Sequence, residues 1–353
     1  MAGATAVPAM AGRRAADGAV PAALERIAAA AAFGVLAEVR DDARVWRGSR
    51  GVARLGTRQP VPAGGRFRIG SITKTFVATV VLQLAGEGRL GLDDPLRRWA
   101  PGILPDDDRI TVRHLLQHTS GLENLTNAPA FRALYAPDIA AMRDRTWTAR
   151  ELIAFGAQLP RRFEPGAGWA YANTGYVLLG MVVERVTGNS YGAEIRRRIL
   201  RPLGMRHTRV PGTDPHLDGP HPHGYVPVAG EPVDVTVYNP SLSGAAGEMT
   251  STAADLNTFL SALIRGRLLA PDEQRAMLTA HGTPRDYEYG LGVKTRVTAA
   301  GIRLWGHRGD FFGYAAESWT TGDGRRQLTV AYTPSADLRP ADVTGPLVTA
   351  VFG

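Results

Sequence analysis

The chain has 353 residues, of which 44% are hydrophobic and 21% charged, and its formal net charge is +8. This length allows a large core and predicts two domains, or one domain with a sizeable insertion. The chain contains no cysteine, which excludes disulfides, thiolate metal sites and a cysteine nucleophile. The positive charge comes from scattered arginines without a basic run that interleaves aromatics, so we expect no nucleic-acid partner.

In chain order, we expect a flexible tail over residues 1–20, a helix over 21–31 and extended runs over 34–40, 43–47 and 67–70. A strongly apolar helix is predicted from residue 71 to about 86. Further helices, separated by glycine and proline, are predicted over 111–117, 129–143, 148–158, 174–187, 190–202 and 253–265. Short strands then follow over 289–295, 301–306, 314–320 and 327–332, before a final helix over 337–352.

Strands at both ends of the chain, with helices between them, predict an α/β domain that is split by a helical insertion. We expect residues 21–85 and 246–353 to form the α/β domain and residues 86–245 to form a mainly helical one, with the active site at their interface.

No segment reaches the roughly 20 apolar residues of a membrane span. At the start of the chain, Arg13 and Arg14 follow the mildly apolar stretch instead of preceding it, which does not fit a signal peptide. We therefore expect a cytoplasmic protein. His216, His221 and His223 lie in a Pro/Gly-rich stretch without the spacing of metal ligands, so neither a metal nor a cofactor is expected.

Ser71 opens the apolar helix, and Lys74 lies one turn further on, which places both side chains on the same face. Only two of the 41 basic residues are lysines, Lys74 and Lys294. A buried lysine can lose its proton, whereas arginine cannot, so Lys74 is suited to take the proton of the serine. The simpler alternative, a serine that only caps the helix, does not explain the rare lysine.

Two further motifs follow in the chain. Tyr171-Ala172-Asn173 is the only Y-x-N, and His307-Arg308-Gly309, which follows an expected strand, is the only H-x-G. Each has a structural interpretation on its own, as a core tyrosine, a cap or a strand-end histidine. An S-x-x-K, a Y-x-N and an H-x-G in this order together favour a catalytic set.

Four segments extend this pattern: FRIGSITKTFVATVVLQLAGEGRLGLDDPL, ITVRHLLQHTSGL, PGAGWAYANTGYVLLGMVVERVTG and YGLGVK with WGHRG. From about residue 22 to its C-terminus, the chain resembles the serine penicillin-recognising enzymes. These are D-alanyl-D-alanine carboxypeptidases, class C β-lactamases and related esterases and acyltransferases. The resemblance implies a β-lactamase/transpeptidase-like fold, an antiparallel sheet flanked by helices with a mainly helical inserted domain.

The resemblance also implies roles for individual residues. Ser71 would be the nucleophile, Lys74 and Tyr171 would share the proton transfers, and Asn173 would orient Lys74 and the substrate amide. His307 would line the opposite wall and tune Tyr171. The backbone N–H groups of Ser71 and Asp310 would form the oxyanion hole.

Arg308, Gly309 and Lys294 would contact the substrate, which is a small molecule or a peptide. Two positions depart from the carboxypeptidase pattern. Asp310 replaces a hydroxyl residue and would repel a substrate carboxylate unless Arg308 or another cation compensates. Lys294 stands where these carboxypeptidases carry an arginine. A lysine keeps the charge but cannot make the two parallel hydrogen bonds that a guanidinium makes with a carboxylate.

Three functions remain open from the sequence. The first is a carboxypeptidase-like hydrolase that cleaves a peptide, amide or ester bond through an ester on Ser71. The second is a biosynthetic acyltransferase or peptide cyclase, and the third a non-catalytic ligand-binding homologue. A further motif, the G-x-S-x-G at 188–192, lacks the preceding strand that a nucleophile elbow needs, so Ser190 is expected to cap a helix.

Overall fold

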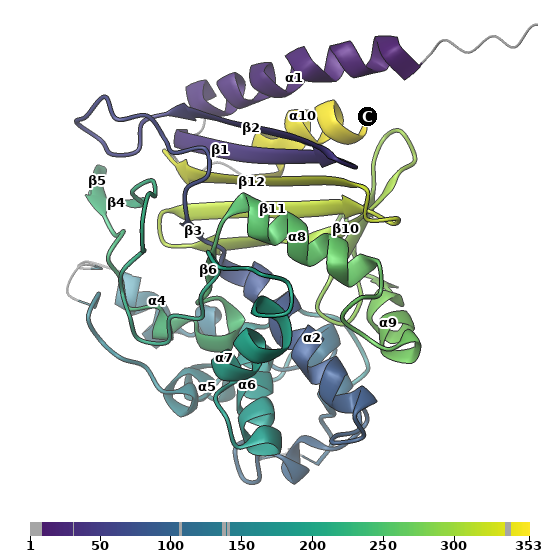
Figure 1. Ribbon diagram of the computed structural model, residues 1–353. Helices are drawn as coiled ribbons and strands as arrows, with labels where there is room; N and C mark the ends of the chain where they lie inside the picture. Colours follow the sequence, from purple (N-terminus) through teal and green to yellow (C-terminus); the bar gives the residue numbers. More distant parts are fainter. Residues whose placement is uncertain (1–8, 31, 106–107, 136–138, 140–141, 336–339) are drawn as a thin grey trace, which may run out of the picture.

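The computed structural model describes residues 9–30, 32–105, 108–135, 139, 142–335 and 340–353 (Figure 1). Its centre is an eight-stranded sheet in which every neighbouring pair is antiparallel. In spatial order the strands are β2 (Arg44–Gly51), β1 (Ala32–Asp41), β12 (Arg326–Pro334), β11 (Tyr314–Thr321), β10 (Arg303–Phe311), β9 (Lys294–Val297), β8 (Glu288–Tyr289) and β7 (His281–Gly282). The predicted antiparallel sheet flanked by helices is thus confirmed.

Helices cover both faces of this sheet. α1 (Ala9–Ala30) and α10 (Pro340–Phe352) lie together on one face, and α8 (Ala253–Ile264) packs on the other (Figure 1). Because successive side chains of a strand point to opposite faces, Val35 and Ala37 of β1 join the cluster under α1 and α10. Leu36 between them joins the larger cluster on the α8 side. Both faces are therefore apolar, and the sheet forms the middle layer.

The segments between the two ends of the sheet are mainly helical (Figure 1). They comprise α2 (Thr73–Gly86), α3 (Val112–Gln117), α4 (Pro129–Arg132), α5 (Ala149–Ala157), α6 (Asn173–Thr187), α7 (Tyr191–Ile195) and, beyond α8, α9 (Pro271–Leu278). Two short strand pairs complete the fold, β3 (Phe67–Arg68) with β6 (Thr250–Ser251) and β4 (Tyr225–Val228) with β5 (Glu231–Asp234).

α2 owes its helical form to packing. Threonine and valine, which are poor helix formers, recur along it, yet every residue from Thr73 to Leu82 is buried. A helix that is apolar on all sides is stable only inside a protein. α2 packs against α6 and α9, so the first residues of this central helix are held firmly.

Several elements differ from the sequence expectation. The single strand predicted over 289–295 is instead two short strands, β8 and β9, which pair with each other. α1 begins at Ala9, so the predicted tail over residues 1–20 is helical from there onward. Alanine, the best helix former, dominates this stretch. Within the helix predicted over 129–143, α4 and one 3₁₀ turn cover residues 129–135 and residues 142–143 form a turn, while residues 136–138, 140 and 141 lie outside the described part of the chain. The predicted strand 301–306 extends to Phe311, so the H-x-G motif lies within β10. Among the described residues, no helix is long and apolar enough to cross a membrane.

Candidate active site

Ser71 lies in a 3₁₀ turn, Gly70–Ile72, directly before α2. The turn is held against the residue that precedes β6, because the Ile69 N–H donates to the Met249 carbonyl at 2.9 Å. Gly70 has a φ of +48°, and a Cβ at this position would lie 2.5 Å from the backbone nitrogen of Asp310. Only glycine fits such a left-handed conformation against another backbone. The turn therefore brings Ser71 beside β10.

Lys74 is fully buried and its amine has three polar neighbours. Nζ lies 2.9 Å from Ser71 Oγ, 2.7 Å from Asn173 Oδ1 and 2.7 Å from the Ala246 carbonyl. The last two atoms can only accept hydrogen bonds. A neutral amine has two N–H groups for these acceptors, and its lone pair then faces the hydroxyl of Ser71. This arrangement suits a general base.

Electrostatics favour the neutral form of Lys74. Burial is the main reason that its pKa falls well below the usual range, and the positive charge of Lys294 lowers it further. Desolvation destabilises a charged amine because the protein interior solvates charge poorly. This shift favours the neutral amine that a general base requires.

Tyr171 precedes α6 and stands beside both lysines of the chain. Its ring centroid lies 5.0 Å from Lys74 Nζ and 5.7 Å from Lys294 Nζ. Burial raises the pKa of the Tyr171 phenol well above its usual value, and a hydrogen bond with the Ser71 side chain acts in the opposite direction. The phenol is therefore protonated at neutral pH and contacts the serine hydroxyl.

Asn173 is the first residue of α6, and this position explains how its side chain reaches Lys74. Its backbone N–H donates to Asn124 Oδ1 at 3.1 Å, which fixes the start of the helix. The Asn173 amide oxygen then accepts the hydrogen bond from Lys74. The structure thus joins the first and second motifs directly.

His307 lies on β10 with 1% of its surface exposed. Its Nδ1 faces the Arg308 carbonyl at 2.5 Å and its Nε2 faces the Tyr289 hydroxyl at 3.1 Å. A carbonyl can only accept, so Nδ1 carries the proton and Nε2 accepts from Tyr289. Burial and the charges of Lys294 and Lys74 lower the pKa of His307 well below its usual value, which keeps the ring neutral.

The expectation that His307 tunes Tyr171 has only indirect geometric support. The two ring centroids are 6.4 Å apart, and both hydrogen bonds of the imidazole go elsewhere. Tyr289 is the residue that His307 contacts directly.

Gly309 and Asp310 pass close to the Ser71 turn. A Cβ on Gly309 would lie 2.0 Å from the Ile69 carbonyl oxygen and 2.5 Å from the Ser71 nitrogen, so this close approach requires glycine. The backbones of Ser71 and Asp310 are thus neighbours. This placement is compatible with an oxyanion hole formed by their two N–H groups.

The charge of Asp310 is compensated within its own strand. Arg308 Nη2 donates to Asp310 Oδ1 at 2.8 Å, so the guanidinium compensates the charge of this carboxylate. Lys294 instead lies over aromatic rings, 4.2 Å from the centroid of Tyr287. Burial and the charge of Arg308 lower its pKa to about 8.

Two residues without a predicted role also contact this site. His118 is buried with a φ of +63°, its ring centroid lies 4.3 Å from that of Tyr171, and its Nδ1 accepts from the Ala172 N–H at 3.3 Å. The Tyr289 hydroxyl donates a hydrogen bond to His307 Nε2. Both belong to segments that carry the family resemblance, but no periodicity or spacing indicates that they meet at Tyr171 and His307.

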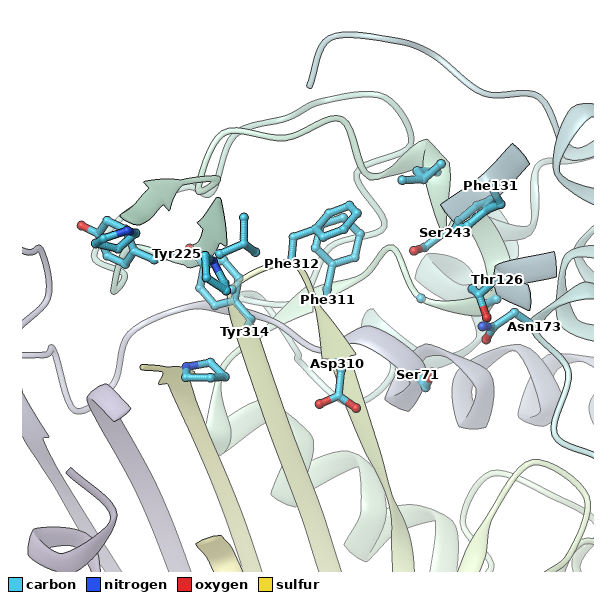
Figure 2. A pocket seen from close by; sticks show the side chains of 18 of the residues that line it. Ser71, Thr126, Phe131, Asn173, Tyr225, Ser243, Asp310, Phe311, Phe312 and Tyr314 are labelled. Carbon is cyan, nitrogen blue, oxygen red and sulfur yellow. The ribbon is translucent and has the colours of Figure 1, made fainter. Parts of the chain in front are cut away.

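A groove of about 560 Å³ opens beside Ser71, and we refer to it as the Ser71 groove. Figure 2 shows Asn173, Phe131 and Ser243 on the Ser71 side of the groove, with Phe311 and Phe312 in the middle and Tyr225 and Tyr314 at the far end. Ser190 lies elsewhere and caps α7, accepting from the Ala193 N–H at 3.1 Å. The expectation that it is a helix cap is therefore confirmed.

Comparison with known proteins places this geometry in a family. The family model described as Beta-lactamase matches residues 19–347. The chain belongs to the beta-lactamase family. Its resemblance to penicillin-recognising enzymes is thereby confirmed. Penicillin-binding protein 4* of Bacillus subtilis is 28% identical over 308 residues, which cover 80% of this chain and 64% of that protein.

Solved structures of other proteins superpose over nearly the whole chain. A D-stereospecific amidohydrolase from Streptomyces sp. is 38% identical with a TM-score of 0.88, covering 95% of this chain and 98% of its own. A D-amino acid amidase from Ochrobactrum anthropi SV3, complexed with D-phenylalanine, is 28% identical with a TM-score of 0.84 over the same shares. The chain spans less than two thirds of curated relatives such as penicillin-binding protein 4* and Esterase EstB of Burkholderia gladioli, of which it covers 43%.

Proposed function

We propose that the protein is a serine hydrolase that cleaves amide or ester bonds through a covalent ester on Ser71. The observation that carries this proposal is the set of contacts around Lys74 Nζ, which leaves one direction open for a proton, toward Ser71 Oγ. A serine beside a desolvated amine is an activated nucleophile.

In the acylation step, Ser71 Oγ attacks the substrate carbonyl carbon while its proton passes to Lys74 Nζ. The N–H groups of Ser71 and Asp310 stabilise the resulting oxyanion. The C–N or C–O bond then breaks, and the Tyr171 hydroxyl gives its proton to the leaving amine or alcohol. The proton on Lys74 returns to Tyr171, so both groups recover their starting states.

In the deacylation step, water attacks the ester carbonyl and loses a proton to the same pair of groups. The Ser71–acyl bond breaks, Ser71 Oγ regains a proton, and the acid product leaves. Asn173 holds the Lys74 amine throughout by its hydrogen bond of 2.7 Å.

We propose D-configured amino acid amides as a substrate class, because similar structures are named a D-stereospecific amidohydrolase and a D-amino acid amidase. The narrower role of a D-alanyl-D-alanine carboxypeptidase has less support. Arg308 already pairs with Asp310, which weakens its attraction for a substrate carboxylate.

The test is ammonia release from D-phenylalanine amide and from its L enantiomer. We expect faster release from the D form and none above background in Ser71→Ala. The matched control is Ser190→Ala, a serine that caps α7. That variant should keep its activity and lose about 1 kcal/mol of stability. Equal activity of Ser71→Ala and wild type would contradict the proposal.

A further inference from the structure

The Ser71 groove continues well beyond the reacting atoms. It extends from Ser71 across the tip of the β10–β11 hairpin to the β4–β5 hairpin (Figure 2). Its volume of about 560 Å³ lies within the range of sites that take small organic ligands, roughly 300–1,000 Å³. The groove thus has room for more than the side chain of one amino acid.

Apolar side chains dominate the lining along its whole length. Phe131 lies toward the Ser71 end, Phe311 and Phe312 lie in the middle, and Tyr225 and Tyr314 lie at the far end (Figure 2). All but Phe312 are less than a tenth exposed, so they form the wall of a depression and not an exposed patch. An apolar ligand would therefore gain contact over its whole length.

Charge is nearly absent from this lining. Among the described residues, Asp310 is the only charged one that lines the groove, and Arg308 neutralises its carboxylate. A charged ligand group in the far half would lose its hydration without finding a partner. The far half of the groove therefore favours an uncharged part of the ligand.

The far wall is anchored to the strand that leads into Ser71. Arg68 of β3 is 1% exposed, and its Nη2 donates to the carbonyls of Pro215, Thr236 and Tyr238 at 2.7–3.0 Å. Its guanidinium also lies 4.8 Å from the centroid of the Phe311 ring. One buried side chain thus fixes the segment that carries β4 and β5 against the middle of the groove, which is consistent with a preformed site.

The proposed reaction assigns a direction to the groove. Tyr171 gives its proton to the leaving group, so the leaving group lies beside Tyr171 and Lys294. Neither of these residues lines the groove in the described part of the chain, whereas Ser71 and Asp310 do. The other substituent of the carbonyl carbon, the acyl part, therefore points into the groove.

From these observations, and resting on the proposed function, we propose that the Ser71 groove is the acyl subsite. It selects donors whose acyl part carries bulky, uncharged, apolar groups that extend past Phe311 toward Tyr225.

The experiment uses the p-nitrophenyl esters of acetate, butyrate and octanoate, which share one leaving group. Burying one methylene group is worth about fourfold in binding, so we expect kcat/KM to rise at least about tenfold from acetate to octanoate. The suberate monoester has the octanoate chain with a terminal carboxylate, and it should lose most of this gain.

A blocking variant locates the effect. Val226→Trp adds bulk on β4, where Val226 lines the far half, and the ratio of octanoate to acetate kcat/KM should fall at least about fivefold. The matched control is Val45→Trp on β2, at a valine that is 51% exposed, and this variant should keep the wild-type ratio.

The outcomes separate the two proposals. Ser71-dependent acetate hydrolysis with a flat chain-length profile, or an unchanged ratio in Val226→Trp, would overturn the acyl subsite and leave the hydrolase intact. Turnover that survives in Ser71→Ala would overturn the hydrolase itself.

Discussion

The two sides of Ser71 differ in how many ionisable groups they contain and in how these groups are buried. On one side, Lys74 and His307 are buried with lowered pKa values, and each of their polar atoms meets a specific partner. On the other side, the Ser71 groove is aromatic, and the carboxylate of Asp310 is neutralised by Arg308. The comparison indicates that desolvated ionisable groups perform the chemistry, whereas uncharged surface selects the donor. The variants below test the reacting side of this comparison.

We expect the largest effect from Lys74→Arg. Arginine remains protonated at any physiological pH and cannot act as the base, so kcat/KM should fall at least about 10³-fold. Hydrolysis of an ester or amide substrate measures the loss, with circular dichroism as the check on folding. The comparison variant is Lys294→Arg, which retains a cation over Tyr287 and should lose far less. Retention of most of the activity in Lys74→Arg would show that Lys74 acts only through its charge, since arginine keeps that charge.

A large effect is also expected from Gly70→Ala. The new Cβ would lie 2.5 Å from the Asp310 nitrogen, so the backbones of the two proposed oxyanion donors must separate. Loss of one such donor typically costs about 10²-fold in kcat, and a steady-state measurement of kcat tests this.

Gly56→Ala is the matched control for Gly70→Ala. Gly56 also has a positive φ, but a Cβ at that position meets nothing within 4 Å. It should therefore lose only about 1 kcal/mol to backbone strain and keep its kcat. Equal kcat values in the two variants would argue against the oxyanion role.

The smallest expected effect is a shift in pH dependence. The charge of Lys294 lowers the pKa of Lys74, and Lys74 must be neutral to accept the serine proton. kcat/KM should thus rise with pH as Lys74 loses its proton. In Lys294→Met the pKa of Lys74 rises, so this limb should move to higher pH. A limb that stays in place would mean that Lys294 does not influence Lys74.

The sequence predicted the sheet, most of the helices and the positions of Ser71, Lys74, Tyr171 and His307, because each signal lies in a short motif or a local periodicity. The start of α1 and the length of β10 were wrong, since element ends depend on packing with distant strands. The sequence did not indicate the Ala246 carbonyl at Lys74, or His118 beside Tyr171. These contacts join segments more than 50 residues apart, and no local pattern encodes such pairs.

No pattern in the sequence predicted the groove. Phe311 and Tyr225 come from two hairpins that only the tertiary fold brings together, with Arg68 between them. Aromatic residues in a sequence suggest a core as readily as a binding surface, so their role depends on the cavity.

The most direct test of the central claim is intact-protein mass spectrometry after brief exposure to a fluorophosphonate or a slowly released ester. We predict a single added acyl or phosphonyl group in the wild-type protein, located on the peptide that contains Ser71 by digestion. Ser71→Ala should remain unmodified, and Ser190→Ala should be labelled like the wild type. A folded wild-type protein that gains no mass, or an adduct on any residue other than Ser71, would contradict covalent catalysis at this serine.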